Sequence, residues 1–249
     1  MPKAAKKVVI FLVEGAYDEI ALFAVMEKIF EDTNAIRFHI CHGDITAKKD
    51  INEANVLREI SKIIRKIIDN DKLFNAKDIQ KIIHLIDTDG AFIPLDSVRG
   101  LPAGAQNIIY GSDYIEVANV VAQRSQMASK KRVVTKLNSI NELTIIGKNR
   151  SVPYQICYFS RNLEHVLWDK SNVYSQDEKR ELAEEFDNQY ANAPDDFIRL
   201  ISGKVNVPGA YKDTWDFIFQ GFNSLHRHTN LFHSIKPFIT PPDKGIVSS

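Results

Sequence analysis

Short apolar runs alternate with amphipathic segments along the first ninety residues. The apolar runs at residues 8–13, 36–40 and 82–86 are rich in β-branched side chains and end at polar or glycine residues. Runs of this length and composition predict buried strands. Residues 16–30 and 52–68 carry apolar side chains at helical spacing, which predicts two amphipathic helices. The alternation predicts an α/β fold with a mostly parallel sheet covered by helices.

The pattern weakens after residue 90 and becomes helical towards the C-terminus. Residues 91–151 are interrupted by prolines and glycines, and one helix is predicted around Tyr114–Ser129. A fourth strand is predicted at Tyr154–Phe159, followed by a helix that Ser160 or Asn162 caps. We therefore expect an α/β domain at residues 1–170 with an insert at about 91–151, followed by a helical C-terminal extension at 171–249.

The composition argues against several classes of protein. The 32 basic and 32 acidic residues balance, which argues against a globally basic protein that coats nucleic acid. Cys41 and Cys157 have no zinc-type spacing and are typical of buried cysteines in a reducing compartment. No apolar stretch approaches the roughly 20 residues of a membrane span, and the first apolar run is too short for a signal peptide. We expect a cytoplasmic protein with no membrane partner.

Acidic residues follow two of the predicted strands. Glu14 ends the first strand, and Asp18 lies in the first turn of the next helix, where the helix dipole by itself favours an acid. Asp87 and Asp89 close the third strand, and the two-residue period of a strand would direct them to the same side. Their repulsion would be relieved by a divalent cation, although a solvated Asx turn explains the same pair.

Basic residues are concentrated in one region. Residues 124–150 hold seven lysines and arginines but a single acid, which predicts either a solvated loop or a surface for a phosphate backbone. The candidate nucleic-acid-binding residues are Lys130, Lys131, Arg132 and Lys136. His42 and Asp44 follow the second strand and are further candidates for the site, although they belong to no recognisable motif.

Glu14-Gly15 after the first strand and Asp87-Thr88-Asp89-Gly90 after a later one resemble the TOPRIM domain of topoisomerases, primases and several nucleases. Residues 162–167, Asn-Leu-Glu-His-Val-Leu, are similar to the Asn-x-Glu-x-x-Leu segment of OLD-type TOPRIM nucleases. The resemblance covers about residues 6–170, apart from the insert, and implies a TOPRIM-like, Rossmann-like fold.

The resemblance implies a nuclease that hydrolyses phosphodiester bonds of DNA or RNA with Mg²⁺ or Mn²⁺. It implies catalytic and metal-binding roles for Glu14, Asp87 and Asp89, with Glu14 as a ligand or as a general base. Asp18 and Glu164 would complete a second metal site. Lys130, Lys131 or Lys136 would neutralise phosphate charge in the transition state.

The sequence departs from OLD-type nucleases in lacking a GxxxxGK[ST] phosphate-binding loop. The resemblance therefore implies an ATPase partner in trans, as in phage-defence operons that pair the two proteins. The aromatic C-terminal region is compatible with a homodimer.

Two other functions are compatible with the sequence. Asp-Thr-Asp-Gly also resembles the nucleophile motif of haloacid-dehalogenase-like phosphatases, with Asp87 as nucleophile and Asp89 as acid/base. In that family, however, the motif usually follows the first strand, whereas here it follows the third. The second alternative is a non-catalytic TOPRIM-fold module that binds nucleic acid or a protein partner.

Overall fold

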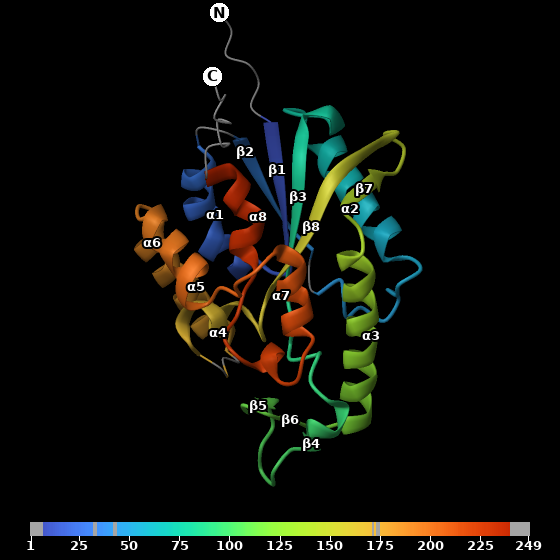
Figure 1. Ribbon diagram of the computed structural model, residues 1–249, viewed down its shortest axis with the longest axis vertical. Coiled ribbons are helices and arrows are strands. Elements are labelled where there is room, and N and C mark those ends of the chain that lie inside the picture. Colours follow the sequence, from blue (N-terminus) through green and yellow to red (C-terminus); the bar gives the residue numbers. More distant parts are fainter. Residues whose placement is uncertain (1–6, 32–33, 42–43, 171, 173–174, 240–249) are drawn as a thin grey trace, which may run out of the picture.

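The protein is built around a mostly parallel sheet with helices on both faces (Figure 1). The structure, a computed structural model, describes residues 7–31, 34–41, 44–170, 172 and 175–239. Within these ranges four strands run parallel and the fifth, an edge strand, runs antiparallel to its neighbour. Across the sheet the strands are β2 (Asn34–Ile40), β1 (Lys7–Val13), β3 (Ile79–Asp87), β8 (Arg150–Phe159) and β7 (Glu142–Ile145). The predicted α/β class and the four predicted strands are confirmed.

The helices form two layers that enclose separate hydrophobic cores. One core lies between the sheet and helices α2, α3 and α7, and the other lies between the sheet and α1, α4, α5, α6 and α8. The helices are α1 (Ala16–Phe30), α2 (Val56–Asn70), α3 (Val120–Asn138), α4 (Leu163–Trp168), α5 (Gln176–Tyr190), α6 (Pro194–Arg199), α7 (Tyr211–Ile218) and α8 (Leu231–Ile239). Short 3₁₀ turns occur at Ala76–Asp78, Leu95–Ser97 and Asn223–Leu225, and a π-helical turn at Leu200–Lys204.

The sequence of strand β1 is continuously apolar because both of its faces are buried. Val8, Ile10 and Leu12 enter the core beneath α2 and α3. The alternate residues Val9, Phe11 and Val13 enter the core beneath α1 and α5. Because successive side chains of a strand point to opposite faces, burial of both faces requires an apolar residue at every position.

The order of the strands creates a crevice at one edge of the sheet. From β1 the chain passes through α1 to β2 on one side, and then through α2 to β3 on the other side of β1. α1 and α2 consequently cover opposite faces. Where neighbouring parallel strands lead to opposite faces, their carboxyl ends leave a crevice that commonly binds ligands. Here that crevice lies beyond β1 and β3, next to Glu14 and Asp87.

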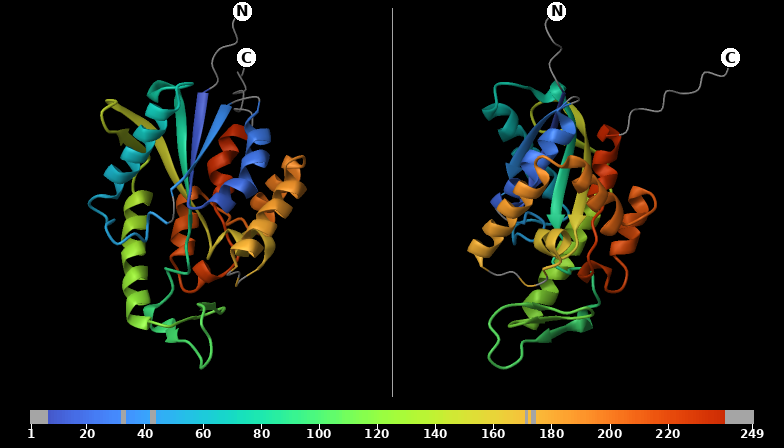
Figure 2. Two further views of the ribbon diagram at one scale, coloured as in Figure 1. Left: turned by 180° about the vertical axis from the view of Figure 1, so that it is seen from behind. Right: turned by 90° about the vertical axis from the view of Figure 1, so that its left-hand side faces the viewer.

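The segment at 91–151 is more ordered than its sequence predicts. It contains a second sheet of β4 (Val98–Gly100), β6 (Ile115–Val117) and β5 (Ile109–Tyr110), followed by α3 and β7. Both views in Figure 2 show this small sheet protruding below the main body. The predicted helix at Tyr114–Ser129 is wrong at both ends, because α3 begins after the cap Asn119 and continues to Asn138. The basic residues from Arg124 to Lys136 therefore lie on a helix rather than in a solvated loop.

The C-terminal region is helical, as predicted, and packs against the rest of the chain. α5 and α8 contribute Phe186 and Ile235 to one core, and α7 contributes Trp215 to the other. The proposed division of the chain at residue 170 stays a prediction. None of the helices in the described ranges is both long and apolar enough to cross a membrane.

Candidate active site

Four carboxylates share one pocket at the carboxyl edge of the sheet. The pocket has a volume of about 420 Å³. Its carboxylates come from Glu14 after β1, Asp18 in α1, Asp87 at the end of β3 and Glu164 in α4. The other residues that line it are Gly15, Ala16, Tyr17, Gln176 and Lys179. We call this site the carboxylate pocket. It brings together four of the five acids to which the family resemblance assigns metal-binding roles.

Glu14 and Asp87 form the centre of the pocket because their strands are neighbours. β1 and β3 pair in parallel up to Leu12 and His84, so the two chains leave the sheet side by side. The backbone N–H of Asp87 donates to Oε1 of Glu14 at 3.0 Å, which fixes the Glu14 side chain over the end of β3. This hydrogen bond joins two residues 73 positions apart in the sequence.

Asp18 and Glu164 reach the pocket from the first turns of two helices. Asp18 Oδ2 accepts from the backbone N–H of Gly15 at 2.8 Å, so it caps α1 as well as lining the pocket. Asn162 caps α4 by accepting from the N–H of His165 at 2.9 Å. That cap begins the helix that carries Glu164, whose side chain is buried. The Asn-x-Glu spacing is thus a cap followed by a pocket-lining acid.

The electrostatics of the pocket favour a bound positive charge. Desolvation, followed by repulsion from Glu14 and Asp18, raises the pKa of Asp87 well above its usual range. Desolvation and the nearby Asp44 carboxylate do the same to the pKa of Glu14. Desolvation and Glu164 raise the pKa of Asp18 to about 6. Carboxylates that repel each other in a partly desolvated pocket are stabilised in their charged form by a cation.

Asp89 does not line this pocket. Strand β3 ends at Asp87, and Asp89 has a left-handed backbone with φ of 49°, so the alternation of a strand does not apply to it. Its Oδ2 instead accepts from Nζ of Lys130 at 2.6 Å. The same ammonium donates to Oδ2 of Asp44, also at 2.6 Å. We call Asp44, Lys130 and Asp89 the Lys130 bridge.

The turn after β3 is held by buried hydrogen bonds. Thr88 is fully buried, and its hydroxyl accepts from the N–H of Arg161 at 2.8 Å. The N–H of Asp89 donates to the carbonyl of Arg161 at 2.8 Å. Gly90 has φ of +64°, and a Cβ there would lie 2.6 Å from Leu225 and 2.8 Å from Ile115. Glycine is therefore required at this position, both for its backbone conformation and for space.

Two lysines of the site differ from the sequence expectation. Lys130 has a side chain that is only 2% exposed, so it is not presented on the surface for a phosphate backbone. Lys179 lies 3.2 Å from Oε1 of Glu164 in the carboxylate pocket, and sequence reasoning missed it. Both lysines precede buried apolar residues at helical spacing: Val133, Val134 and Leu137 follow Lys130, and Ala183 and Phe186 follow Lys179. That spacing was the available signal.

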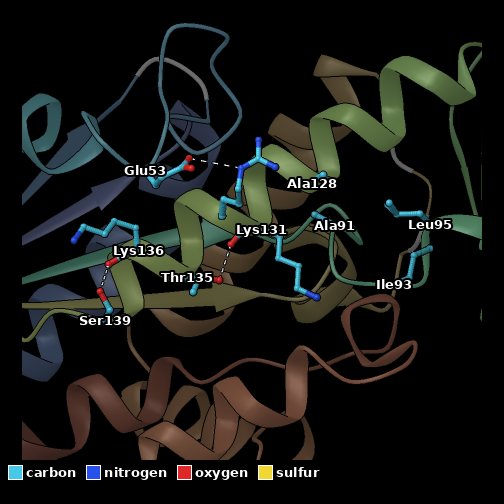
Figure 3. A pocket seen from close by; sticks show the side chains of 10 residues that line it. Glu53, Ala91, Ile93, Leu95, Ala128, Lys131, Thr135, Lys136 and Ser139 are labelled. Carbon is cyan, nitrogen blue, oxygen red and sulfur yellow. Dashed lines mark hydrogen bonds and ion pairs between the residues drawn. The ribbon is translucent and has the colours of Figure 1, made fainter.

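The remaining basic candidates lie together in a groove beside α3. The groove has a volume of about 650 Å³, and the segment after Gly90 forms its apolar wall. Lys131 and Lys136 extend from α3 in opposite directions (Figure 3). Arg132 pairs with Glu53 at 3.6 Å. The lining residues are Glu53, Ala91, Ile93, Leu95, Ala128, Lys131, Arg132, Thr135, Lys136 and Ser139. We call this surface the basic groove.

The donor chemistry of the carboxylate pocket fits Mg²⁺ or Mn²⁺, which prefer carboxylate oxygens. In the described part of the chain, however, no three His, Cys, Asp or Glu side chains converge as a ready-made metal site. Asp18 and Glu164 are directed to Gly15 and Lys179 instead. Cation binding would therefore require these two carboxylates to turn from their present partners.

The histidine of β3 and the residues after β2 were also candidates for the site. His84 is buried in β3 against the Tyr154 hydroxyl at 2.7 Å, which supports a structural role. His42 lies outside the described residues, whereas Asp44 belongs to the Lys130 bridge. Comparison of the chain with protein-family models, with curated proteins and with solved structures found no match.

Proposed function

We propose that this chain is a TOPRIM-like nuclease that hydrolyses phosphodiester bonds of DNA or RNA with Mg²⁺ or Mn²⁺. The observation that carries the proposal is the carboxylate pocket. Glu14, Asp87 and Glu164 come from three separate segments and meet at the crevice between β1 and β3. Structural ion pairing would have matched each acid with a base, whereas Glu14 and Asp87 repel each other. Such an arrangement is costly in the absence of a bound cation and is typical of functional sites.

The pattern of carboxylates also agrees with the family resemblance. Glu14 and Asp87 occupy the two strand ends at which the TOPRIM signature has its acids. Glu164 occupies the acid of the Asn-x-Glu-x-x-Leu segment, next to the helix cap Asn162. A fold-level likeness alone would not indicate an activity, so the proposal depends on these side chains sharing one pocket.

In the proposed reaction the carboxylates of the pocket hold the cation, and Lys179 contacts the substrate. Glu14 and Asp87 would hold the divalent cation, which would supply activation of water and stabilisation of the leaving oxygen of the phosphodiester. Oε1 of Glu14 is engaged by the Asp87 N–H, which leaves Oε2 to bind the cation or to accept a proton from water. Lys179, with a side chain 27% exposed, is the ammonium at the pocket that could contact a phosphate oxygen.

The basic groove supplies a surface for the rest of the nucleic acid. Its cationic residues Lys131 and Lys136 project from the helix that also carries Lys130. Its apolar wall begins at Ala91, two residues after Asp89. The groove and the Lys130 bridge are therefore bounded by the same two segments, which suits a strand that runs from the groove towards the sheet edge.

Cleavage assays test the proposal. The purified protein would be incubated with supercoiled plasmid, single-stranded DNA and structured RNA in Mg²⁺, Mn²⁺ or EDTA. Glu14→Gln and Asp87→Asn remove one charge each with little change in shape. Asp177→Asn is the matched control, since Asp177 is 80% exposed on α5 and lies outside the pocket.

The proposal predicts metal-dependent cleavage of at least one substrate, lost in both pocket variants and kept in the control. Hydrolysis of p-nitrophenyl phosphate without nucleic-acid cleavage would instead favour the phosphatase. Binding of nucleic acid with no cleavage under any condition would favour the non-catalytic module. Either result would overturn the nuclease.

A further inference from the structure

Lys130 is a buried cation that the proposed chemistry does not use. Its side chain is 2% exposed, and its Nζ lies 2.6 Å from Oδ2 of Asp44 and 2.6 Å from Oδ2 of Asp89. Lys130 belongs to the buried face of α3 together with Met127, Val133, Val134 and Leu137, so the helix directs the ammonium inwards. A lysine held in this way cannot leave the site to follow a substrate.

The Asp44 carboxylate of the Lys130 bridge is already satisfied. Oδ1 of Asp44 accepts from the N–H of Thr46 at 2.7 Å, while its Oδ2 accepts from Lys130. Desolvation alone would raise the pKa of Asp44, but the Lys130 ammonium and the Thr46 hydrogen bonds outweigh it and hold that pKa below its usual range. Asp44 is therefore a charged carboxylate with its counter-ion in place.

In the part of the chain that the structure describes, the centre of the carboxylate pocket has no directly paired base, and the Lys130 ammonium only partly offsets the raised pKa of Glu14. Among the described residues, no lysine or arginine forms an ion pair with Glu14, Asp18 or Asp87. Lys179 pairs with Glu164, at the side of the pocket formed by α4 and α5. Within the described residues, Glu14, Asp18 and Asp87 are thus the carboxylates of the pocket that have no directly paired base.

We propose that Lys130 takes the place of a metal ion at Asp89, so that Asp89 is not a ligand and the protein binds one divalent cation at Glu14, Asp18 and Asp87. Asp18 would turn from the Gly15 N–H to complete this site. This inference rests on the proposed function and sets the number of metal ions that each chain binds. The ammonium supplies a fixed positive charge beside Asp89, where the family resemblance alone would assign a metal ligand. Asp89 is then a positioning residue that anchors Lys130 and the turn after β3.

Titration with Mn²⁺ tests the inference without any cleavage step. Isothermal calorimetry and electron paramagnetic resonance of free Mn²⁺ would count the bound ions at pH 7.5. We expect one ion for the native chain. Asp87→Asn should weaken its binding by at least about a hundredfold, since a ligand is lost. The matched variant Asp89→Asn should weaken it by less than about fivefold, since only a more distant charge is lost.

A third variant, Lys130→Met, removes the proposed substitute and should raise the count from one ion to two. Because this variant removes a buried charge, its folding must be checked by circular dichroism, but the native count and the Asp87/Asp89 pair decide the inference without it. Two ions in the native chain, or one ion whose binding is lost in Asp89→Asn, would overturn the inference. Neither result would contradict the proposed nuclease activity. Absence of Mn²⁺ binding by the native chain would overturn both.

Discussion

The carboxylate pocket and the Lys130 bridge lie at the same edge of the sheet but balance charge in opposite ways. In the bridge, one buried ammonium lies 2.6 Å from each of two aspartates. In the pocket, desolvation raises the pKa values of both Glu14 and Asp87, and repulsion from Asp44 on Glu14 and from Glu14 on Asp87 adds to it. The difference indicates that the bridge holds a built-in cation, whereas the pocket retains an electrostatic imbalance that a bound cation can relieve.

The largest expected effect is on catalysis. Glu14→Gln and Asp87→Asn should each lower kcat by roughly a thousandfold, because metal-assisted stabilisation is worth several kcal/mol and each 1.4 kcal/mol is a factor of ten. In metal-free buffer the same variants should be no less stable than the native chain, since each removes a repulsion. Single-turnover cleavage and thermal unfolding measure the two effects. A loss of activity that parallels a loss of folding would contradict this assignment.

The bridge should show the opposite behaviour. Lys130→Met leaves Asp44 and Asp89 facing each other without a counter-ion, which should lower the free energy of unfolding by about 3 kcal/mol. Urea denaturation measures it. Lys131→Met, on the next residue of α3 but directed to the basic groove, is the control and should change stability by less than about 0.5 kcal/mol. Equal effects of the two variants would show that the bridge is not a structural ion pair.

The two glycines of the site should also differ. Gly90→Ala places a Cβ within 3 Å of Leu225 and Ile115 at a left-handed φ, and should cost about 2 kcal/mol of stability. Gly15→Ala meets only Asp18 Oδ2, at 3.9 Å, and should be nearly neutral. Denaturant unfolding of both variants measures the difference. A neutral Gly90→Ala would mean that the turn after β3 can relax.

The basic groove should affect binding more than chemistry. Lys131→Ala and Lys136→Ala, in a cleavage-deficient Asp87→Asn background, should each weaken nucleic-acid binding by about 3- to 10-fold and reduce the salt slope by about one. Fluorescence anisotropy at several salt concentrations measures both quantities. Lys62→Ala is the control, since Lys62 is 56% exposed on α2 and outside the groove. A similar loss of nucleic-acid affinity in the control would show that the groove contributes only through general surface charge.

The smallest effect is the dependence of stability on pH. The pKa of Asp18 is raised to about 6 from its ordinary 3.8, so the folded state holds more protons than the unfolded state between about pH 4 and 6. The free energy of unfolding of the metal-free protein should therefore decrease as the pH rises through this window. Asp18→Asn should flatten the profile, which thermal unfolding at several pH values would show. A rise in stability over the same window would contradict the pKa assignment.

Local sequence pattern was sufficient to predict the sheet and the acids at its edge. β1 and β3 are apolar at nearly every position because both faces are buried, and acids directly after such strands must lie at the carboxyl edge. The capping role of Asn162 was also predictable, because a cap depends on residues within one helical turn.

The partners across the site were not predictable in the same way. Asp44 and Lys130 are 86 residues apart, and only the packing of α3 against the sheet brings them together. An incorrect start and end for α3 concealed the fact that Lys130 lies on its apolar stripe. The departure of Asp89 from the strand required knowledge of its φ of 49°, which depends on the hydrogen bond to Arg161 rather than on neighbouring residues.

The most direct test of the account is the position of Mn²⁺ in a crystal of the native chain, located by its anomalous scattering. The account predicts one peak at the carboxylate pocket, coordinated by Glu14, Asp18 and Asp87, with Lys130 still between Asp44 and Asp89. A peak coordinated by Asp89, or no peak at the carboxyl edge of the sheet, would contradict it.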